Sequence, residues 1–270
     1  MPETDKLFAG SIPENYDRDM VPLIFESYAR DIAQRVAKLA PKSVLETAAG
    51  SGAVTRALAP ILAPDASYVV TDLNQPMLDY AKSRQGADSR ISWQQADAQA
   101  LPFGDAAFDL VCCQFGAMFF PDRPSGYREA RRVLRPGGYF LFSVWDRIEE
   151  NVFANDVTDA LAAFFPNDPP RFMARTPHGY HDLALIRSDL AKAGFKYATI
   201  ETVKAQSRAP SARHVALAYC QGTPLRNEIE ARGPDRLAAA TDHAAAVITI
   251  RHGGGAISAK IQAHIILARV

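Results

Sequence analysis

Three features are scarce or missing in this sequence of 270 residues: cysteine, a surplus of basic residues, and long apolar runs. The three cysteines follow no disulfide framework, which is typical of reduced thiols in a cytoplasmic setting. Thirty basic residues balance thirty acidic ones, so the chain lacks the positive excess that nucleic-acid binding usually requires. No stretch is long and apolar enough to cross a membrane, and the polar N-terminus shows no signal peptide. These absences predict a cytoplasmic protein with no nucleic-acid partner and no membrane span.

Helical and extended patterns alternate along the chain, which is typical of a parallel sheet with helices on both faces. Residues 15–40 have helical spacing, with Pro22 as a break or first-turn residue. Seven strands are expected, over residues 43–47, 67–73, 90–95, 108–114, 139–145, 195–204 and 258–268. The segment 135–138 (RPGG) is expected to be a turn, and residues 146–181 show no clean period. Alternating apolar and polar residues predict that the last strand is half-buried.

The turn after the first expected strand reads ETAAGSG. Ligands of open parallel sheets bind at this edge, and Gly50 and Gly52 permit a close backbone approach. Glu46 would repel a diphosphate but attract a cationic amine, and Thr55 stands where a dinucleotide-binding loop has its third glycine. Asp72, at the end of the second strand, can bind both hydroxyls of a ribose. The predicted ligand therefore has a ribose and a positive group but no diphosphate.

Five motifs in this order resemble those of the class I S-adenosylmethionine-dependent methyltransferases, and more closely the small-molecule (type 11) branch of ubiquinone/menaquinone biosynthesis-type enzymes. They are ETAAGSG, TDLNQPMLDYA, QADAQALPF, FDLVCCQFG and REARRVLRPGGYFLFSVWD, and together they cover about residues 43–146. The segment FAGSIPENYD is similar to one that precedes the domain in such enzymes. Ala48 departs from the family's first loop glycine, and we expect its Cβ either to push the loop slightly or to require a negative φ.

The resemblance implies cofactor contacts, and these are assigned residue by residue. Glu46, Gly50 and Gly52 would hold the methionyl end, and Asp72 would bind the ribose. Leu73 and Met77 would lie against one adenine face, and Asp97 and the Ala98 N–H would bind the adenine edge. Gln114 would line the methionyl or the methyl-donor region, and Tyr16 would close over the cofactor. The cofactor is expected to be S-adenosyl-L-methionine, with S-adenosyl-L-homocysteine as product, and no metal is expected because no second ligand cluster accompanies the histidines.

Candidates for the acceptor side lie outside these motifs. His178 and His181, in RTPHGYHD at the entrance to the expected cap, are the candidate catalytic bases. The alternative is that Asp182 caps a helix and the histidines are polar surface. The expected apolar acceptor pocket takes its lining from phenylalanines: Phe119, Phe120, Phe153, Phe164, Phe165 and Phe172. Val111 stands where a proline would precede a catalytic cysteine, so Cys112 and Cys113 are interpreted as buried structural thiols.

We therefore predict an α/β protein: a Rossmann-like, doubly wound, seven-stranded sheet, its last strand antiparallel, with a helical cap. One methyltransferase domain is expected over 1–270, divided into an N-terminal helical segment (1–42), a cofactor-binding core (43–146), cap segments (147–181 and 205–256) and a final strand (257–270). The expected activity is direct methyl displacement onto a small-molecule acceptor. The alternatives are a non-catalytic S-adenosylmethionine-binding protein and an NAD(P)-dependent oxidoreductase, and a homodimer stays open.

Overall fold

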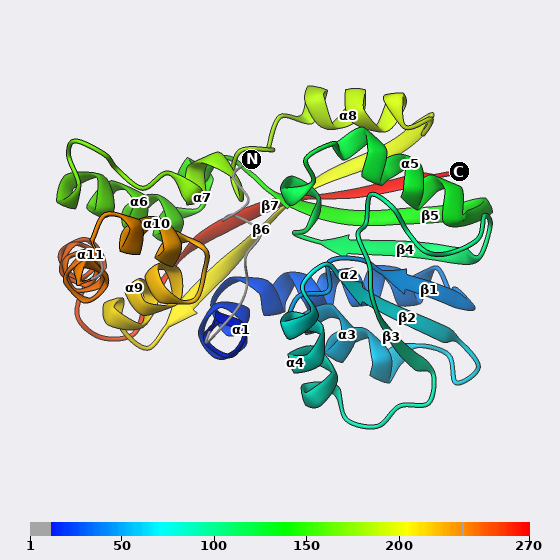
Figure 1. Ribbon diagram of the computed structural model, residues 1–270, viewed down its shortest axis with the longest axis horizontal. Helices are drawn as coiled ribbons and strands as arrows, with labels where there is room; N and C mark the ends of the chain where they lie inside the picture. The colour runs from blue at the N-terminus through cyan, green and yellow to red at the C-terminus, as the bar shows by residue number, and fades with distance from the viewer. Residues whose placement is uncertain (1–11, 234) are drawn as a thin grey trace.

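The computed structural model describes residues 12–233 and 235–270, and its centre is a sheet of seven strands (Figure 1). The strand order is β3-β2-β1-β4-β5-β7-β6, with β1 to β5 parallel and β7 antiparallel to both β5 and β6. The strands are β1 Ser43–Glu46, β2 Ser67–Asp72, β3 Ile91–Gln95, β4 Phe108–Gln114, β5 Leu134–Trp145, β6 Tyr197–Ala209 and β7 Ile257–Arg269. The predicted doubly wound sheet with an antiparallel last strand is therefore confirmed. Because the strand order reverses at β1, the crevice beside its carboxyl end is the expected ligand position.

Helices cover the sheet in two layers, α2, α3 and α4 in one and α5 and α8 in the other (Figure 1). The helices are α1 Ile12–Asn15, η2 Tyr16–Phe25, α2 Glu26–Lys38, α3 Ala53–Leu58, η3 Ala59–Ile61, α4 Gln75–Gln85, η4 Ala117–Phe119, α5 Arg123–Val133, η5 Ile148–Glu150, α6 Val152–Phe164, α7 Phe172–Arg175, α8 Leu183–Lys192, α9 Ala212–Gln221, α10 Leu225–Ala231 and α11 Arg236–His252. The central strands are apolar on both faces, and Leu45, Leu110 and Val111 are fully buried.

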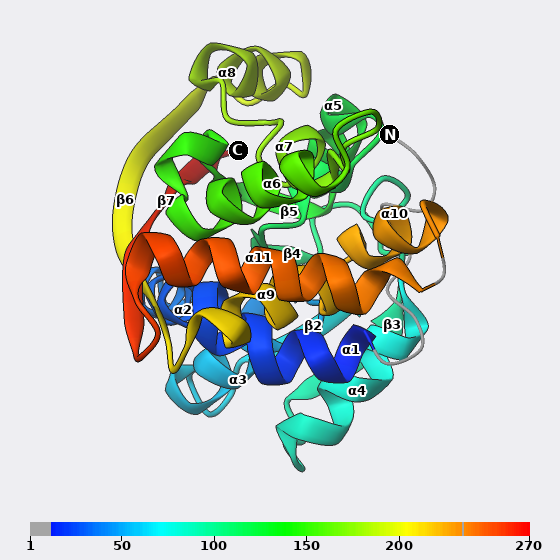
Figure 2. The ribbon, with the colours of Figure 1, turned by 90° about the vertical axis from the view of Figure 1, so that its left-hand side faces the viewer.

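A second group of helices, α6, α7, α9, α10 and α11, lies at one end of the sheet, in front of the strands in Figure 2. The sequence showed no clean period over 146–181, yet this stretch contains α6 and α7. Helix α6 was missed because its apolar pattern is irregular: the charged Asp156 is buried, whereas the apolar Val152 and Phe164 are only partly buried.

Three local expectations were wrong. Pro22 does not break the first helix: the chain stays helical from Ile12 to Lys38, and Pro22 lies inside the π-helical η2, whose wider turns tolerate a missing N–H. The expected turn at 135–138 belongs to β5, which pairs with β4 through a register shift, with Gly137 at φ +83°. The polar side of β7 is exposed only at its start: Ser258 is exposed, whereas Gln262 and His264 further along are only 7% and 4% exposed.

Candidate functional site

One cavity runs along the carboxyl ends of the five parallel strands. Following the strand order from β3 to β5, its lining residues at or just after these strand ends are Asp97, Asp72, Glu46, Gln114 and Trp145. Neighbouring strands lie about 4.8 Å apart, so this row is about 19 Å long. The cavity encloses about 1360 Å³, including the part open to solvent, which is enough for a cofactor and a small second molecule. Carboxylates occupy one end of the row and an aromatic ring the other.

Glu46 is buried at the end of β1 and has partners that the sequence did not reveal. The hydroxyl of Thr55 donates to Glu46 Oε2 at 2.7 Å, and the Tyr68 hydroxyl donates to the same oxygen. Burial nevertheless raises the pKa of Glu46 to about 7, since loss of water outweighs these two hydrogen bonds. A cation placed beside this carboxylate would restore its ionised form.

Asp72 supports the loop after β1 while facing the cavity. Its Oδ2 accepts a hydrogen bond from the Gly50 N–H at 2.8 Å, and its Oδ1 accepts one from the Asn74 N–H at 2.7 Å. Burial raises the pKa of Asp72, and these backbone donors oppose that effect. Each carboxylate oxygen keeps accepting capacity for a diol, which is the function that the sequence predicted for this position.

Ala48 adopts φ +53°, so the expectation of a negative φ at this position was wrong. The left-handed conformation costs an L-residue roughly 1–2 kcal/mol. The space for the Ala48 Cβ comes from Gly116, because a Cβ at Gly116 would lie only 2.4 Å from the Cβ of Ala48. The two facing positions therefore hold one methyl group between them, that of Ala48, and no side chain at Gly116.

Nine of the ten predicted cofactor residues line the cavity: Tyr16, Glu46, Gly50, Asp72, Leu73, Met77, Asp97, Ala98 and Gln114. Gly52 is the exception. It adopts φ +82° just before α3, and a Cβ there would approach Ala81 of α4 to 3.0 Å. Gly52 therefore allows α3 and α4 to pack closely, and it does not line the cavity as we expected.

Aromatic rings form the wall at the β5 end of the cavity. Phe115 and Trp145 stack with centroids 3.8 Å apart and planes at 4°, and Phe25 packs against both. Phe115 adopts φ +52°, which is rare for a bulky residue, and its N–H is bonded to the Ser143 carbonyl. Of the six predicted phenylalanines, Phe119, Phe120 and Phe172 line the cavity, whereas Phe153, Phe164 and Phe165 do not. The tight stack holds the two rings of this wall against each other.

Gln114 separates the carboxylate end of the row from the aromatic end. Its Nε2 donates to the Phe25 carbonyl in η2 at 3.1 Å, which fixes the orientation of the side-chain amide. Its Oε1 is buried and has no hydrogen-bond partner among residues 12–233 and 235–270. A buried unpaired amide oxygen costs about 1–3 kcal/mol.

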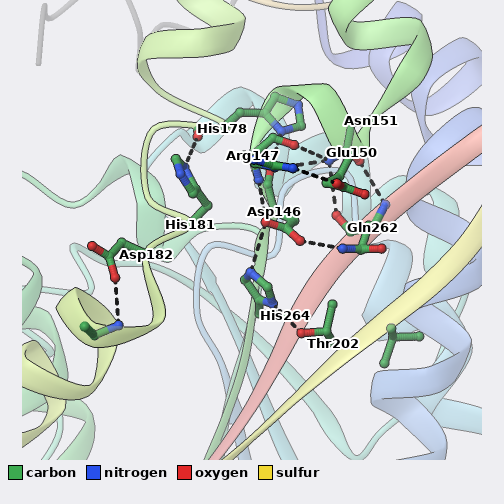
Figure 3. Close-up of polar contacts among 12 residues, drawn as sticks. Asp146, Arg147, Glu150, Asn151, His178, His181, Asp182, Thr202, Gln262 and His264 are labelled. Atoms are coloured by element: carbon green, nitrogen blue, oxygen red, sulfur yellow. Dashed lines mark hydrogen bonds and ion pairs between the residues drawn. The ribbon is translucent and has the colours of Figure 1, made fainter.

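His178 and His181 do not line the cavity, so the structure gives no support to their prediction as catalytic bases. The Nδ1 atom of His178 contacts the Asp146 carbonyl at 2.8 Å, and that of His181 contacts the His178 carbonyl at 2.9 Å (Figure 3). Burial lowers the pKa of His178 to about 4, which makes it a poor base at neutral pH. The alternative interpretation of the segment is partly correct, because the Asp182 side chain caps α8.

Sequence reasoning predicted that Tyr16 covers the carboxylate end, but it missed the contacts that hold the helix of Tyr16 in place. Asp17 of η2 accepts hydrogen bonds from the Ser51 hydroxyl at 2.8 Å and from Arg56 Nη2 at 2.5 Å. These contacts fasten η2 onto the loop after β1, and Tyr16 and Met20 of the same helix line the cavity. Asp17 lies in the first turn of η2, and only the fold brings it to Ser51. Residues 1–11, with the start of the FAGSIPENYD segment, lie outside the described residues.

Comparisons with known proteins agree with this geometry. A family described as a methyltransferase domain matches residues 45–142. The ubiquinone/menaquinone biosynthesis C-methyltransferase UbiE of Ectopseudomonas mendocina (strain ymp) is 29% identical over 168 residues, 58% of this chain and 66% of that protein. The matched segment thus spans just under two thirds of that relative's length.

Solved structures share the fold. A Bacillus halodurans C-125 protein, BH2331, described as a candidate methyltransferase, aligns over 89% of this chain and 97% of its own, with 20% identity and a TM-score of 0.57. The [4+2]-cyclase SpnF aligns over 91% of this chain and 81% of its own, with 17% identity and a TM-score of 0.55. At these identities the likeness concerns the fold alone.

Proposed function

Because this chain belongs to the class I S-adenosyl-L-methionine-dependent methyltransferases, we propose that it transfers the cofactor's methyl group directly to a small-molecule acceptor. The observation that carries the proposal is the single cavity in which three carboxylates stand beside an aromatic wall. The fold alone does not support methyl transfer, since SpnF shares this fold and is named a cyclase.

The residues of the carboxylate end fit the cofactor. A sulfonium nucleoside amino acid has an ammonium group, a ribose diol and a purine, and it lacks phosphates. Glu46, Asp72 and Asp97 would bind these three groups in turn, in the order in which β1, β2 and β3 lie in the sheet. None of the described lining residues is Lys, Arg or His, so a diphosphate would meet three carboxylates without a balancing cation. This argues against the dinucleotide alternative.

When bound, the cofactor supplies an electrophilic methyl group. The chain's own part is to align this group with the acceptor and to keep water out. Phe115 and Trp145 would line the acceptor end, together with Met20 and Ile24 of η2. Gln114 stands between the two ends as a polar, uncharged side chain, which suits a reaction in which a positive charge disappears from the sulfur.

The cofactor half of the proposal is tested by titration calorimetry with S-adenosyl-L-homocysteine and, separately, with NAD⁺. We expect the wild-type protein to bind the first and not the second. Asp72→Ala should weaken S-adenosyl-L-homocysteine about 100-fold, because two hydrogen bonds to a charged group contribute about 3 kcal/mol together. The matched control is Asp79→Ala, which removes an exposed carboxylate of α4 that bonds Gln75. Equal affinities in the two variants would refute the ribose assignment.

The transfer half is tested by mass spectrometry. The protein is incubated with S-adenosyl-L-methionine carrying a deuterated methyl group and with a panel of small phenols, enols and amines. Direct transfer predicts one intact CD3 group on an acceptor and one equivalent of S-adenosyl-L-homocysteine. Cofactor binding without turnover of any acceptor would instead favour the non-catalytic alternative.

A further inference from the structure

One short segment of the cap contributes three buried residues to the lining of the cavity. These are Phe172, Met173 and Pro177, from α7 and the turn after it. We call residues 172–178 the cap strap. None of the three lining side chains is charged, and Trp145 at the end of β5 lines the same cavity. The position of the cap strap relative to β5 therefore affects the shape of the cavity beside Trp145.

His178, the last residue of the cap strap, connects it to the end of β5. Its Nδ1 lies 2.8 Å from the carbonyl oxygen of Asp146, the residue that follows Trp145 (Figure 3). Because a carbonyl oxygen can only accept, Nδ1 carries the proton and donates this hydrogen bond. The ring centroids of His178 and Trp145 lie 6.0 Å apart, and the His178 N–H donates to the Met173 carbonyl at 3.0 Å. One residue thus contacts both the lining segment and the aromatic wall.

The residue that accepts from His178 is itself held by the sheet. Asp146 Oδ2 accepts from Gln262 Nε2 of β7 at 2.6 Å, and the Asp146 N–H donates to the Gln262 carbonyl at 3.1 Å. Asp146 Oδ1 accepts from the Arg147 N–H at 2.7 Å, and His264 Nε2 lies 3.3 Å from the same oxygen. The Asp146 carbonyl therefore has a defined position, to which His178 ties the cap strap.

The start of the cap strap is held differently, by a contact within the cap. Oε2 of Glu228, in α10, accepts from the Arg171 N–H at 2.7 Å and from the Phe172 N–H at 3.2 Å. This carboxylate joins α7 to α10 and does not reach the sheet, whereas the side chain of His178 does. The two contacts hold the cap strap at both of its ends.

From these contacts we propose that His178 is a positioning residue for the methyl acceptor: its Nδ1–H holds the cap strap against the end of β5, which keeps the acceptor aligned with the cofactor. This inference rests on the proposed function. His178 acts through Trp145 and the cap strap and does not touch the reacting atoms, so its role differs from that of the catalytic base predicted from the sequence. Alignment of this kind matters because a small displacement of a reacting group slows transfer strongly.

A neutral aromatic probe, 2-naphthol, tests the inference, since the cap strap and Trp145 offer no charged side chain. Its binding is measured by calorimetry on protein saturated with S-adenosyl-L-homocysteine. We expect His178→Leu to bind 2-naphthol about tenfold more weakly than wild type, because it loses one buried hydrogen bond that holds the cap strap. S-adenosyl-L-homocysteine should bind as in wild type. Equal weakening of both ligands, or no binding of 2-naphthol to the loaded wild-type protein, would overturn the inference.

Two conservative variants test the Nδ1 atom itself. His178→Asn places an N–H donor where Nδ1 lies, whereas His178→Gln places one nearer the position of Nε2. We expect Asn to restore the affinity for 2-naphthol and Gln to behave like Leu. If His178 served only to fill space, the apolar Leu would suit the buried position better than Asn, and the order would be reversed. That reversed order, or equal affinities in the Leu and Asn variants, would refute the proposal.

The fluorescence of Trp145 gives a second measurement that needs no ligand. The sequence has two tryptophans, so Trp93→Phe leaves Trp145 as the only one. In that background we expect His178→Leu to make Trp145 several-fold more accessible to quenching by acrylamide, and His178→Asn to leave it protected. Unchanged quenching in His178→Leu would show that the aromatic wall does not depend on this contact, and would contradict the proposal.

His252→Leu is the matched control. His252, in α11 of the cap, has its Nε2 2.6 Å from Asp156 Oδ2, and neither residue lines the cavity. This variant should lower stability without changing the quenching of Trp145 or the affinity for 2-naphthol. If it has the same effects as His178→Leu, a general loosening of the cap is responsible and the proposal is wrong.

The proposed function fails in a different way. If the wild-type protein binds no S-adenosyl-L-homocysteine, the cofactor site is wrong. If it binds that ligand and 2-naphthol but the His178 variants match wild type, only the positioning role of His178 is wrong.

Discussion

The affinity for the cofactor should depend on pH through one buried carboxyl group. Burial raises the pKa of Glu46 to about 7, so near neutral pH a large share of the ligand-free protein carries this group protonated. The ammonium group of the ligand pairs only with the ionised form. Binding must therefore remove the proton from Glu46, and affinity should fall as the pH decreases below 7.

The size of the effect follows from the pKa. For one group with a pKa near 7, the affinity for S-adenosyl-L-homocysteine should be about 25-fold lower at pH 5.5 than at pH 7.5. At pH 6 the complex should release about 0.9 proton per ligand bound. Calorimetry in two buffers that differ in ionisation enthalpy measures both quantities. The range stays below pH 7.5 so that the ligand's amine remains protonated.

Glu46→Gln removes the titrating group and keeps its shape. Its affinity should be lower than the wild-type plateau and independent of pH, and its proton release should be close to zero. Asp97→Asn is the control, because it alters the adenine contact and leaves Glu46 in place, so the wild-type slope should persist. A wild-type affinity that is flat from pH 5.5 to 7.5, or that rises as the pH falls, would refute the reasoning.

Two further predictions concern stability. Gly116→Ala should lower the free energy of unfolding by about 2–3 kcal/mol in urea titrations, because the new Cβ would lie 2.4 Å from the Ala48 Cβ and 2.8 Å from Cys113 Sγ. Adding Ala48→Gly should recover about half of that loss by removing the closer contact; no recovery would contradict the pairing of these positions. Glu46→Gln should stabilise the ligand-free protein by up to about 3 kcal/mol at pH 8, because a folded pKa raised to about 7 means that ionised Glu46 costs stability at high pH. This advantage should shrink to below about 1 kcal/mol at pH 5 in thermal unfolding, and a greater advantage at pH 5 than at pH 8 would contradict the assignment.

The sequence predicted the parts of the site that depend on strand ends. Parallel strands place their carboxyl ends at one edge, so Glu46, Asp72 and Asp97 could be brought together from the order of strands alone. The glycine loop also indicated where the backbone approaches a ligand, although Gly52 serves helix packing instead. Hydrophobic periodicity and turn-forming residues are patterns of a few neighbouring residues. The predictions of the strand ends and of the glycine loop depended only on such local patterns.

What the sequence did not predict depends on contacts between distant segments. The Asp17–Ser51 hydrogen bond, the space that Gly116 leaves for Ala48, and the stack of Phe115 on Trp145 each join residues from separate elements. No local pattern marks such pairs. For His178 and His181 the sequence predicted a catalytic function that the structure does not support. Histidines near the expected cap suggested catalysis, whereas both side chains contact backbone carbonyls.

No helix within residues 12–233 and 235–270 is long and apolar enough to span a membrane. The three cysteines are free and buried, as the absence of a disulfide framework predicted. The division into core and cap segments stays a prediction, and so does the choice between monomer and homodimer.

A crystal structure of the protein with S-adenosyl-L-homocysteine tests the assignment of this cavity most directly. We predict the ligand's amine beside Glu46, its ribose hydroxyls on Asp72, its purine beside Asp97 and its sulfur facing Gln114. A ligand bound elsewhere on the chain, or lying in the cavity with its purine at the aromatic wall and its amine away from Glu46, would contradict that assignment.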